Sequence, residues 1–183
     1  MSELETARLL LRRWREDDLD PYARMCADPE VMRYVGGTPF TREQSERQLR
    51  DFMAHWEEHG FGLWAAVHKA DDRFIGFVGL MTHTWFPGVE VGWRLDRGYW
   101  GRGLAPEGAA ESLRYGFEDL GLDRIVSIHE PDNAASRRVM EKNGLTFDLE
   151  TVLPHNQTLV WVYAITREQW ARVQRDTGRP PGS

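Results

Sequence analysis

Residues 98–108 read GYWGRGLAPEG, a turn with glycine at positions 98, 101, 103 and 108 and arginine at position 102. The alternating segment VEVGWRL at 89–95, which precedes the turn, is typical of a strand. The apolar spacing after the turn predicts a helix from Pro106 to about Leu120. The first N–H groups of a helix have no backbone partner, and glycine lets a ligand approach the backbone closely. The sequence therefore predicts an anion cradle between this strand and this helix.

Arg102 and Pro106 narrow the expected anion to a phosphate or pyrophosphate. Arg102 adds a full charge with two-pronged geometry, and Pro106 loses no needed donor in the first helical turn. A helix dipole contributes only about 0.3–1 kcal/mol, so several N–H groups must act together with Arg102. The alternative is a plain sharp turn with an exposed arginine. A P-loop does not fit, because no Gly-Lys-Ser or Gly-Lys-Thr occurs, and a dinucleotide fingerprint would need glycine at Pro106.

The composition excludes several other classes of function. The 183 residues carry a net charge of −6, which argues against nucleic-acid binding because that needs a basic face. The single cysteine, Cys26, excludes a disulfide framework within the chain and a multi-cysteine zinc site. No apolar run approaches the roughly 20 residues of a membrane-spanning helix, and the first residues do not resemble a signal peptide. We therefore expect a cytoplasmic protein that binds neither nucleic acid nor membrane.

Further strand and helix signals lie on both sides of the turn. Strands are predicted at 7–13, 61–68, 73–83, 89–95, 124–129, 145–153 and 158–165, and helices at 17–27, 41–59, 106–120 and 134–143. Thr41 and Gln44 form a capping box for the second helix, which Gly60 ends. This order predicts an α/β fold with a mixed sheet. We expect one domain over residues 1–176 and a disordered tail at 177–183.

The turn resembles the pyrophosphate loop of the GNAT family, the GCN5-related N-acetyltransferases. Residues 100–105, WGRGLA, match its (Q/R)-x-x-G-x-(G/A) pattern, with Trp100 where the pattern has Gln or Arg. The likeness extends to ETARLLLRRWREDDLD at 5–20, VEVGWRL at 89–95 and HEPDNAASRRVMEKNGLTF at 129–147, so it covers residues 5 to 170. Within the GNAT family, the sequence is similar to the bacterial RimJ/RimL-like branch. The resemblance implies a mostly antiparallel sheet of six or seven strands, about four helices and two central strands that splay apart.

The same resemblance implies acetyl-CoA as the cofactor, lying between the two splayed strands. Its pantetheine arm would pair with the backbone near Trp93, Arg94 and Leu95. The N–H of Leu95 would polarise the acetyl carbonyl, as in an oxyanion hole. The pyrophosphate would lie on the amides of Gly101, Arg102, Gly103, Leu104 and Ala105.

Asn133 and Ser136 match the family's N-x-x-S at the start of a helix. In the family the Asn contacts the cofactor arm and the Ser lies near the thioester sulfur, so Ser136 would protonate the leaving thiolate. Asn133 is also suited simply to cap the helix. Where some relatives carry a proton-donating Tyr, this chain has Met140. Either Ser136 supplies the proton, or the thiolate leaves without an acid.

The attacking amine must lose a proton before it reacts. At pH 7 this costs about 4.6 kcal/mol for a lysine amine and about 1 kcal/mol for an α-amine. Glu90 is our candidate base, because it lies close to where family members carry a strand glutamate that acts through water. The alternative is a solvent-facing residue of the alternating strand. His83 and His129 are further candidates, although a single strand histidine is usually packed or exposed.

The resemblance further implies that the acceptor is a small-molecule amine or a protein N-terminal α-amine, attacked directly in a ternary complex. The early helices and last strands would shape its pocket, with Trp14, Trp56, Trp64, Trp85, Phe86 and His155 as the available rings. Trp85 and Phe86, just before the strand at 89–95, are the predicted substrate contacts. The chain is compatible with a monomer or a homodimer.

Two rival classes of protein remain. Residues 55–59 spell H-x-x-E-H, a zinc-hydrolase motif that places two histidines on one helix face. The segment lies at a helix end and has no evident third ligand, so we expect no metal site. The alternative function is a non-catalytic acyl-CoA-binding or sensor module with a GNAT fold. The missing Tyr permits that alternative, whereas Ser136 and Glu90 weigh against it.

Overall fold

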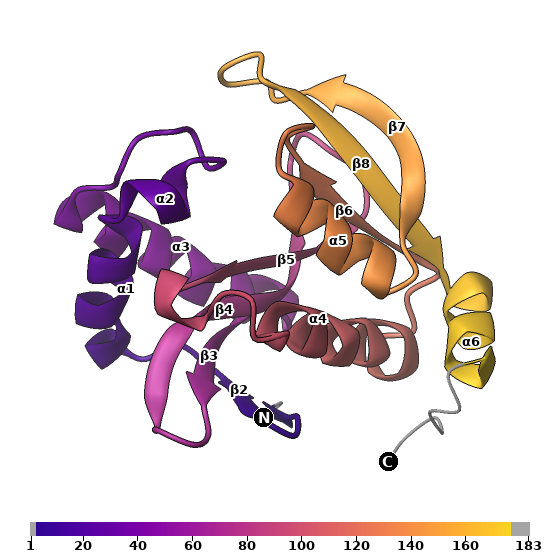
Figure 1. Cartoon of the computed structure of the whole chain (residues 1–183), viewed down its shortest axis with the longest axis horizontal. Helices are drawn as coiled ribbons and strands as arrows, with labels where there is room; N and C mark the ends of the chain where they lie inside the picture. Colours follow the sequence, from indigo (N-terminus) through magenta and orange to yellow (C-terminus); the bar gives the residue numbers. More distant parts are fainter. Residues whose placement is uncertain (1–2, 177–183) are drawn as a thin grey trace. The chain divides into compact units, whose positions relative to one another are not determined.

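A computed structural model describes residues 3–176 of the chain, and the predicted tail at 177–183 lies outside this range. The described residues form an open mixed sheet of eight strands in the order β1-β2-β3-β4-β5-β6-β8-β7 (Figure 1). The predicted α/β fold class is therefore confirmed. The sheet has eight strands rather than six or seven, and the described residues form six α-helices rather than about four.

Each strand and helix predicted from the sequence has a counterpart in the structure. The strands are β1 (Leu4–Glu5), β2 (Leu9–Arg12), β3 (Leu63–His68), β4 (Arg73–Thr82), β5 (Val89–Leu95), β6 (Arg124–His129), β7 (Thr146–Val152) and β8 (Leu159–Thr166). The α-helices are α1 (Leu19–Cys26), α2 (Pro29–Met32), α3 (Arg42–His59), α4 (Leu104–Arg114), α5 (Ala134–Lys142) and α6 (Arg167–Asp176). The short helical turns are η1 (Glu16–Asp18), η2 (Arg97–Tyr99) and the π-helical η3 (Tyr115–Asp119). The elements β1, α2 and α6 were not predicted.

The chain divides into two compact units. Among the described residues, the first unit comprises 3–81 and 92–112, and the second comprises 82–91 and 113–176. Strand β5 and helix α4 each contribute residues to both units.

The first unit contains β1 to β3 and β4 up to Met81, and these strands pair antiparallel with their neighbours. Its core is an aromatic cluster in which Trp14, Tyr22, Phe52 and Phe77 have ring centroids 5.2–6.4 Å apart. Three tryptophans that were pocket candidates are buried here, namely Trp14, Trp56 and Trp64. The indole N–H groups of Trp14 and Trp56 both donate to the Leu63 carbonyl at 2.8 Å. These three rings therefore stabilise the core of this unit.

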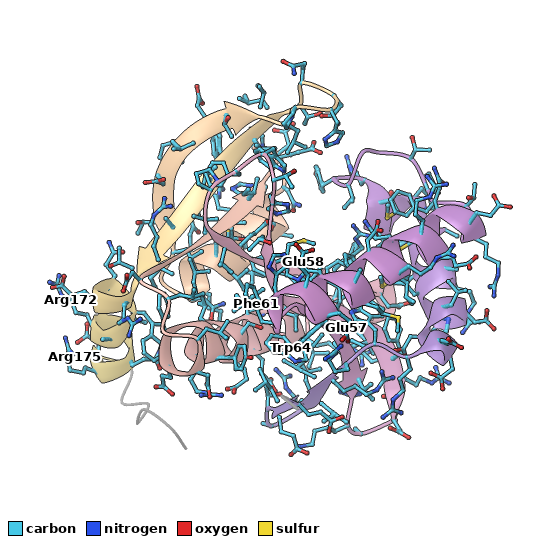
Figure 2. The ribbon with its side chains drawn as sticks, turned by 180° about the vertical axis from the view of Figure 1, so that it is seen from behind. Glu57, Glu58, Phe61, Trp64, Arg172 and Arg175 are labelled. Atoms are coloured by element: carbon cyan, nitrogen blue, oxygen red, sulfur yellow. The ribbon has the colours of Figure 1, made fainter. Side chains whose placement is uncertain are left out.

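Helix α3 begins and ends where its local signals predict. The Thr41 hydroxyl accepts from the Gln44 N–H at 3.2 Å, and the Gln44 side chain accepts from the Thr41 N–H at 2.7 Å. Gly60 follows the helix with a φ of 73°, a left-handed conformation that favours glycine. Figure 2 labels Glu57 and Glu58 in the last turn of α3.

The second unit contains β6, β8 and β7, which pair antiparallel in that order, and the start of β5, which pairs parallel with β6. Phe86 and Ile128 pack on a core of Val126, Val162 and Ala164. Helix α6 is held by Trp170, whose ring lies 5.3 Å from that of Phe117. Arg172 and Arg175 project from this helix (Figure 2).

Helix α4 begins at Leu104, two residues before the predicted start at Pro106. Pro106 therefore occupies the first turn, where a missing N–H leaves no bond unmade. A Cβ on Gly108 would lie 2.7 Å from Val78 Cγ1, so only glycine lets α4 approach β4 this closely. The helix continues as the π-helical η3, and Gly121 follows it with a φ of 70°.

Candidate active site

The glycine turn is fastened to the end of β5 by its own side chains. The Asp96 carboxylate accepts from the Gly98 N–H at 2.8 Å. The Trp100 indole donates to the Leu95 carbonyl at 2.8 Å. Gly101 and Gly103 have φ values of 72° and 76°, which other residues rarely adopt. Trp100, which departs from the expected Gln or Arg, therefore holds the turn in place.

Arg8 binds the carbonyl groups of this turn. Its guanidinium donates to the Arg102 carbonyl at 2.7 Å and to the Gly103 carbonyl at 3.2 Å. Arg8 also forms an ion pair with Glu107 at 2.6 Å, and the Thr6 hydroxyl donates to Glu107 at 2.5 Å. Burial would raise the pKa of Glu107, but the hydrogen bonds from Thr6 and Arg8 and the charge of Arg8 outweigh burial and lower it.

The backbone N–H groups of this turn stay available for a ligand. Within residues 3–176, no acceptor is found for the amides of Gly101, Arg102, Gly103, Leu104 and Ala105. The Arg102 side chain stacks on Tyr99, with Cζ 4.9 Å from the ring centroid. A row of unpaired amides next to a cation is a suitable arrangement for phosphate oxygens.

Glu90 and His83, two of the candidate bases, form a hydrogen-bonded pair in the second unit. One Glu90 oxygen bonds to His83 Nε2, and the other accepts from the Ile128 N–H at 3.2 Å. Nearby, the Ser127 hydroxyl donates to the Val91 carbonyl at 2.8 Å. The alternative interpretation was that Glu90 faces solvent. Its carboxylate is instead engaged by hydrogen bonds on both oxygens.

The pair changes the protonation of His83. Burial would lower the pKa of this imidazole, but the hydrogen bond to Glu90 and its negative charge outweigh burial, so the pKa lies above its ordinary value. The side chains of His83 and Glu90 are 23% and 16% exposed, so solvent reaches the pair only in part. The Trp85 ring lies 5.7 Å from His83 and 5.5 Å from Phe86.

His129, the third candidate base, is buried. Its Nδ1 donates to the Glu130 carbonyl at 2.7 Å, and its ring lies 5.3 Å from Tyr163. Burial, together with the charge of Arg137, lowers the pKa of His129. Its Nε2 is buried and has no hydrogen-bond partner among the described residues.

Asn133 and Ser136 stand at the start of α5. The Asn133 side chain accepts from the Ser136 N–H at 3.1 Å, so Asn133 caps the helix, as one of the two interpretations predicts. The Ser136 hydroxyl forms no hydrogen bond to any residue that the structure describes. Met140, where some relatives carry Tyr, is fully buried.

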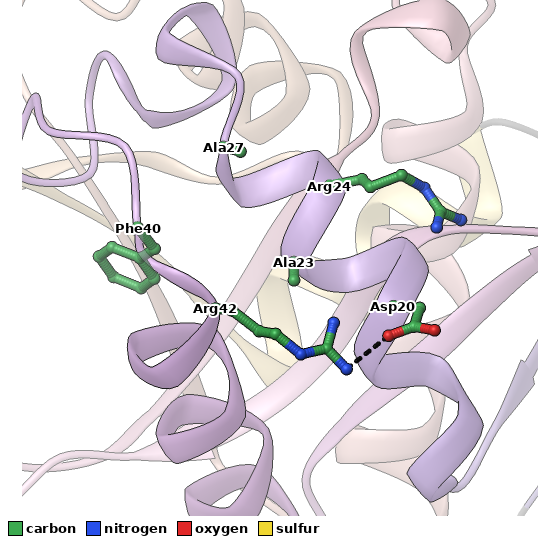
Figure 3. A pocket seen from close by; sticks show the side chains of 6 residues that line it. All are labelled: Asp20, Ala23, Arg24, Ala27, Phe40 and Arg42. Carbon is green, nitrogen blue, oxygen red and sulfur yellow. Dashed lines mark ion pairs between the residues drawn. The ribbon is translucent and has the colours of Figure 1, made fainter.

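Two hollows lie in the first unit. One, of about 450 Å³, is lined by Asp20, Ala23, Arg24, Ala27, Phe40 and Arg42, with an Asp20–Arg42 ion pair at 2.6 Å (Figure 3). The other, of about 540 Å³, is lined by Pro21, Arg24, Met25, Asp72, Arg73, Phe74, Asp96 and Tyr99. Neither is lined by a predicted site residue.

The histidines of the H-x-x-E-H segment serve other contacts. The rings of His55 and His59 lie 4.4 Å apart, and His55 Nδ1 lies 2.9 Å from the Phe61 carbonyl. Across residues 3–176, no three side chains of His, Cys, Asp or Glu gather in a way that could hold a metal ion. In the same range, no helix has the length and apolar character needed to cross a membrane.

Comparisons with known proteins agree on one family. The model of the acetyltransferase (GNAT) domain matches residues 8–146. A relative from Aspergillus fumigatus, named FsC-acetyl coenzyme A-N(2)-transacetylase, is 34% identical over 189 residues, which cover 94% of this chain and 79% of the relative.

Two solved structures are also similar to this chain. The structure of an acetyltransferase from Agrobacterium tumefaciens has a TM-score of 0.78 at 31% identity and covers 89% of this chain and 94% of its own. A ribosomal-protein-S5-alanine acetyltransferase from Vibrio fischeri has a TM-score of 0.73 at 19% identity and covers 93% of this chain and 99% of its own. The second likeness shows the fold alone.

Proposed function

Because the chain belongs to the GNAT acetyltransferase family, we propose that it transfers the acetyl group of acetyl-CoA to a primary amine by direct attack in a ternary complex. The acceptor is the amine of a small molecule or a protein N-terminus. The observation that carries the proposal is the turn at 101–105, whose amides have no acceptor within residues 3–176 while Arg8 holds two of its carbonyls.

The residues present fit acetyl-CoA. In the first unit, the amides of residues 101–105 and the charge of Arg102 bind the pyrophosphate, and the backbone of Trp93, Arg94 and Leu95 binds the pantetheine arm. The Leu95 N–H would donate to the acetyl carbonyl of bound acetyl-CoA and so make it more reactive toward an amine. In the second unit, Asn133 uses its side-chain oxygen for the helix cap, so its NH₂ group is the part left for the cofactor arm.

Glu90 and His83 together accept the proton of the attacking amine. Glu90 keeps its carboxylate beside the imidazole, and the raised pKa of His83 means that the pair holds an added proton readily. Removing that proton matters most for a lysine-like amine, whose deprotonation at pH 7 is unfavourable by about 4.6 kcal/mol. A pair of titratable groups in contact is a common arrangement for general base catalysis.

Ser136 donates the proton that the leaving thiolate takes up. Its hydroxyl is unengaged among the described residues, and Met140 cannot donate a proton. Trp85 and Phe86 contact the acceptor from the segment next to His83.

Several broader features also belong to the proposal. The motifs at 5–20 and 129–147 support the RimJ/RimL-like branch. The proposal includes a cytoplasmic protein, monomeric or homodimeric, that binds no membrane. The net charge of −6 weighs against nucleic-acid binding. The fungal relative's name includes acetyl coenzyme A as donor and an N(2) position, which supports a nitrogen acceptor.

Calorimetric titration with acetyl-CoA tests the turn, with NAD and dephospho-CoA as controls. We expect micromolar binding of acetyl-CoA, and weaker binding by the Arg102→Glu and Arg8→Gln variants, while the surface variant Arg13→Gln binds like the wild type. Unchanged affinity in Arg102→Glu would exclude the phosphate role of that residue. A following screen of amines distinguishes the enzyme from a sensor module, which would bind acetyl-CoA without transferring its acetyl group.

A further inference from the structure

The side chain of Arg94 reaches away from the backbone that the pantetheine arm would use. Its Nη1 donates to the Tyr22 hydroxyl at 3.2 Å, to the Gln48 side-chain oxygen at 3.1 Å and to Cys26 Sγ at 3.5 Å. Tyr22 and Cys26 belong to α1, Gln48 belongs to α3, and both Tyr22 and Cys26 are fully buried. The guanidinium therefore lies against the two early helices of the first unit.

No anion accompanies this cation. Among the residues that the structure describes, Arg94 has no ion pair, and its Nε is buried without a hydrogen-bond partner. Burial raises the pKa of Tyr22, so its hydroxyl does not supply a negative charge. Arg12 in the same unit shows the opposite arrangement, because both of its terminal nitrogens bind Asp18 at 2.7 Å. Arg12 is thus paired with a carboxylate of the chain, whereas Arg94 has no carboxylate partner among the described residues.

One edge of this guanidinium carries two N–H donors that no acceptor engages among the described residues. All three acceptors around Arg94 bind Nη1, so the edge formed by Nε and Nη2 forms no hydrogen bond within residues 3–176. Two parallel N–H groups on one edge match the two oxygens of a carboxylate. The rings of Phe77 and Phe40 lie 5.1 and 6.0 Å from Cζ, so apolar groups border the cation and strengthen its attraction for an anion.

We propose that Arg94 binds a carboxylate of the acceptor through its Nε and Nη2 edge, so that the acceptor is a small amine that also carries a carboxylate, such as an amino acid. The inference rests on the proposed function, because it assigns the acceptor class of the same transferase. The inference favours a small-molecule acceptor. A protein N-terminus is less suitable, because it has no carboxylate at a fixed distance from its amine.

Matched acceptors that differ only in the carboxylate test this assignment. The probes are glycine, β-alanine, 4-aminobutanoate and L-phenylalanine, each compared with its amide. We expect the wild type to acetylate at least one acid with a kcat/KM about tenfold or more above that of its amide, the ratio typical of a charge-assisted hydrogen bond. Arg94→Gln should remove this ratio by slowing the acid alone, and Arg94→Lys should retain part of it.

Two further variants separate binding from folding. Arg50→Gln removes an exposed charge from α3, the helix that carries Gln48, and should retain the wild-type ratio. Gln48→Glu is nearly isosteric and places a carboxylate beside Nη1, so it should lower the ratio even if Arg94→Gln does not fold. Circular dichroism and acetyl-CoA titration of each variant verify the fold and the donor site.

The outcomes distinguish this inference from the function on which it rests. A wild type that does not bind acetyl-CoA contradicts the proposed function itself. A wild type that binds acetyl-CoA and acetylates amides or peptide N-termini as well as acids, or acetylates no acid, overturns the carboxylate site alone. An acid preference that survives in Arg94→Gln also overturns it.

Discussion

At the scale of single residues, Glu90 combines structural contacts with the proposed role of general base. Glu90→Gln keeps an oxygen for the Ile128 N–H but removes the charge beside His83. We expect kcat/KM to fall about 10²- to 10⁴-fold for a lysine-like amine, the usual effect of a general base. The decrease should be smaller for an α-amine, which is far easier to deprotonate at pH 7. Steady-state kinetics with both acceptors measures the difference.

The exposed strand variant Glu150→Gln controls for the loss of a negative charge in the same unit. Equal rates for wild type and Glu90→Gln with both acceptors would remove Glu90 from the mechanism.

The His83–Glu90 pair also predicts a pH dependence of stability. The pKa of His83 is raised by folding, so the pair stabilises the fold fully below the ordinary imidazole pKa of about 6.5. This contribution is lost as the pH rises through the folded-state pKa. The difference in unfolding free energy between wild type and His83→Gln should therefore shrink as the pH increases. Urea denaturation at a series of pH values measures it.

The same comparison in a Glu90→Gln background should reverse the trend, because without the charge of Glu90 the burial of His83 lowers its pKa. In the wild-type background, a difference that grows with pH would contradict the pair.

At the scale of elements, the contact between α4 and β4 depends on Gly108. Alanine is the better helix former by about 1 kcal/mol, but its Cβ would lie 2.7 Å from Val78 Cγ1. Val78 is 1% exposed and stiff in its strand, and overpacking of this kind costs about 1–3 kcal/mol. We expect Gly108→Ala to destabilise the protein by about 1 kcal/mol net. Chemical denaturation checks this value.

The double variant Gly108→Ala, Val78→Ala tests the cause. Removing the Val78 methyl groups relieves the clash, so the double variant should lose less stability than the sum of the single variants. A stabilised Gly108→Ala would show that the helix shifts without penalty.

Most elements were predictable because their signals are local. The capping box of Thr41 and Gln44 and the alternation of residues 89–95 need no knowledge of the rest of the chain. Helix α6 was not predicted, because it is held by the contact of Trp170 with Phe117, more than fifty residues earlier. Helix α2 has only four residues, which is too short for a periodic pattern.

The candidate site was predictable in its parts and not in its pairings. Glu90 and His83 were separate candidates, and their hydrogen bond depends on how the segment between β4 and β5 folds back. Arg8 was missed, because it lies 94 residues before Arg102 and a lone strand arginine carries no signal. The absence of an ion pair at Arg94 within residues 3–176 was equally hidden, since it follows from which side chains helices α1 and α3 place around it.

At the scale of the whole molecule, binding of acetyl-CoA should stabilise the folded chain. A ligand present at 100 times its dissociation constant adds about 2.7 kcal/mol to the free energy of unfolding. For a chain of 183 residues this raises the melting temperature by roughly 5 to 10 °C. Differential scanning calorimetry with acetyl-CoA should show the shift, and NAD at the same concentration should not. The absence of a shift at millimolar acetyl-CoA would count against the transferase.

The reactivity of Cys26 reports on the opening of helix α1 in the first unit. It is the single cysteine of the chain, it is fully buried, and its sulfur lies 3.5 Å from Arg94 Nη1. A thiol-modifying reagent can reach it only in molecules whose helix α1 has come away from the core, so the labelling rate measures how often that helix opens. An acceptor bound at Arg94 would slow the reaction. The rate at which Cys26 gains the mass of the reagent, followed by mass spectrometry, thus measures the opening of helix α1 without any added dye or tag.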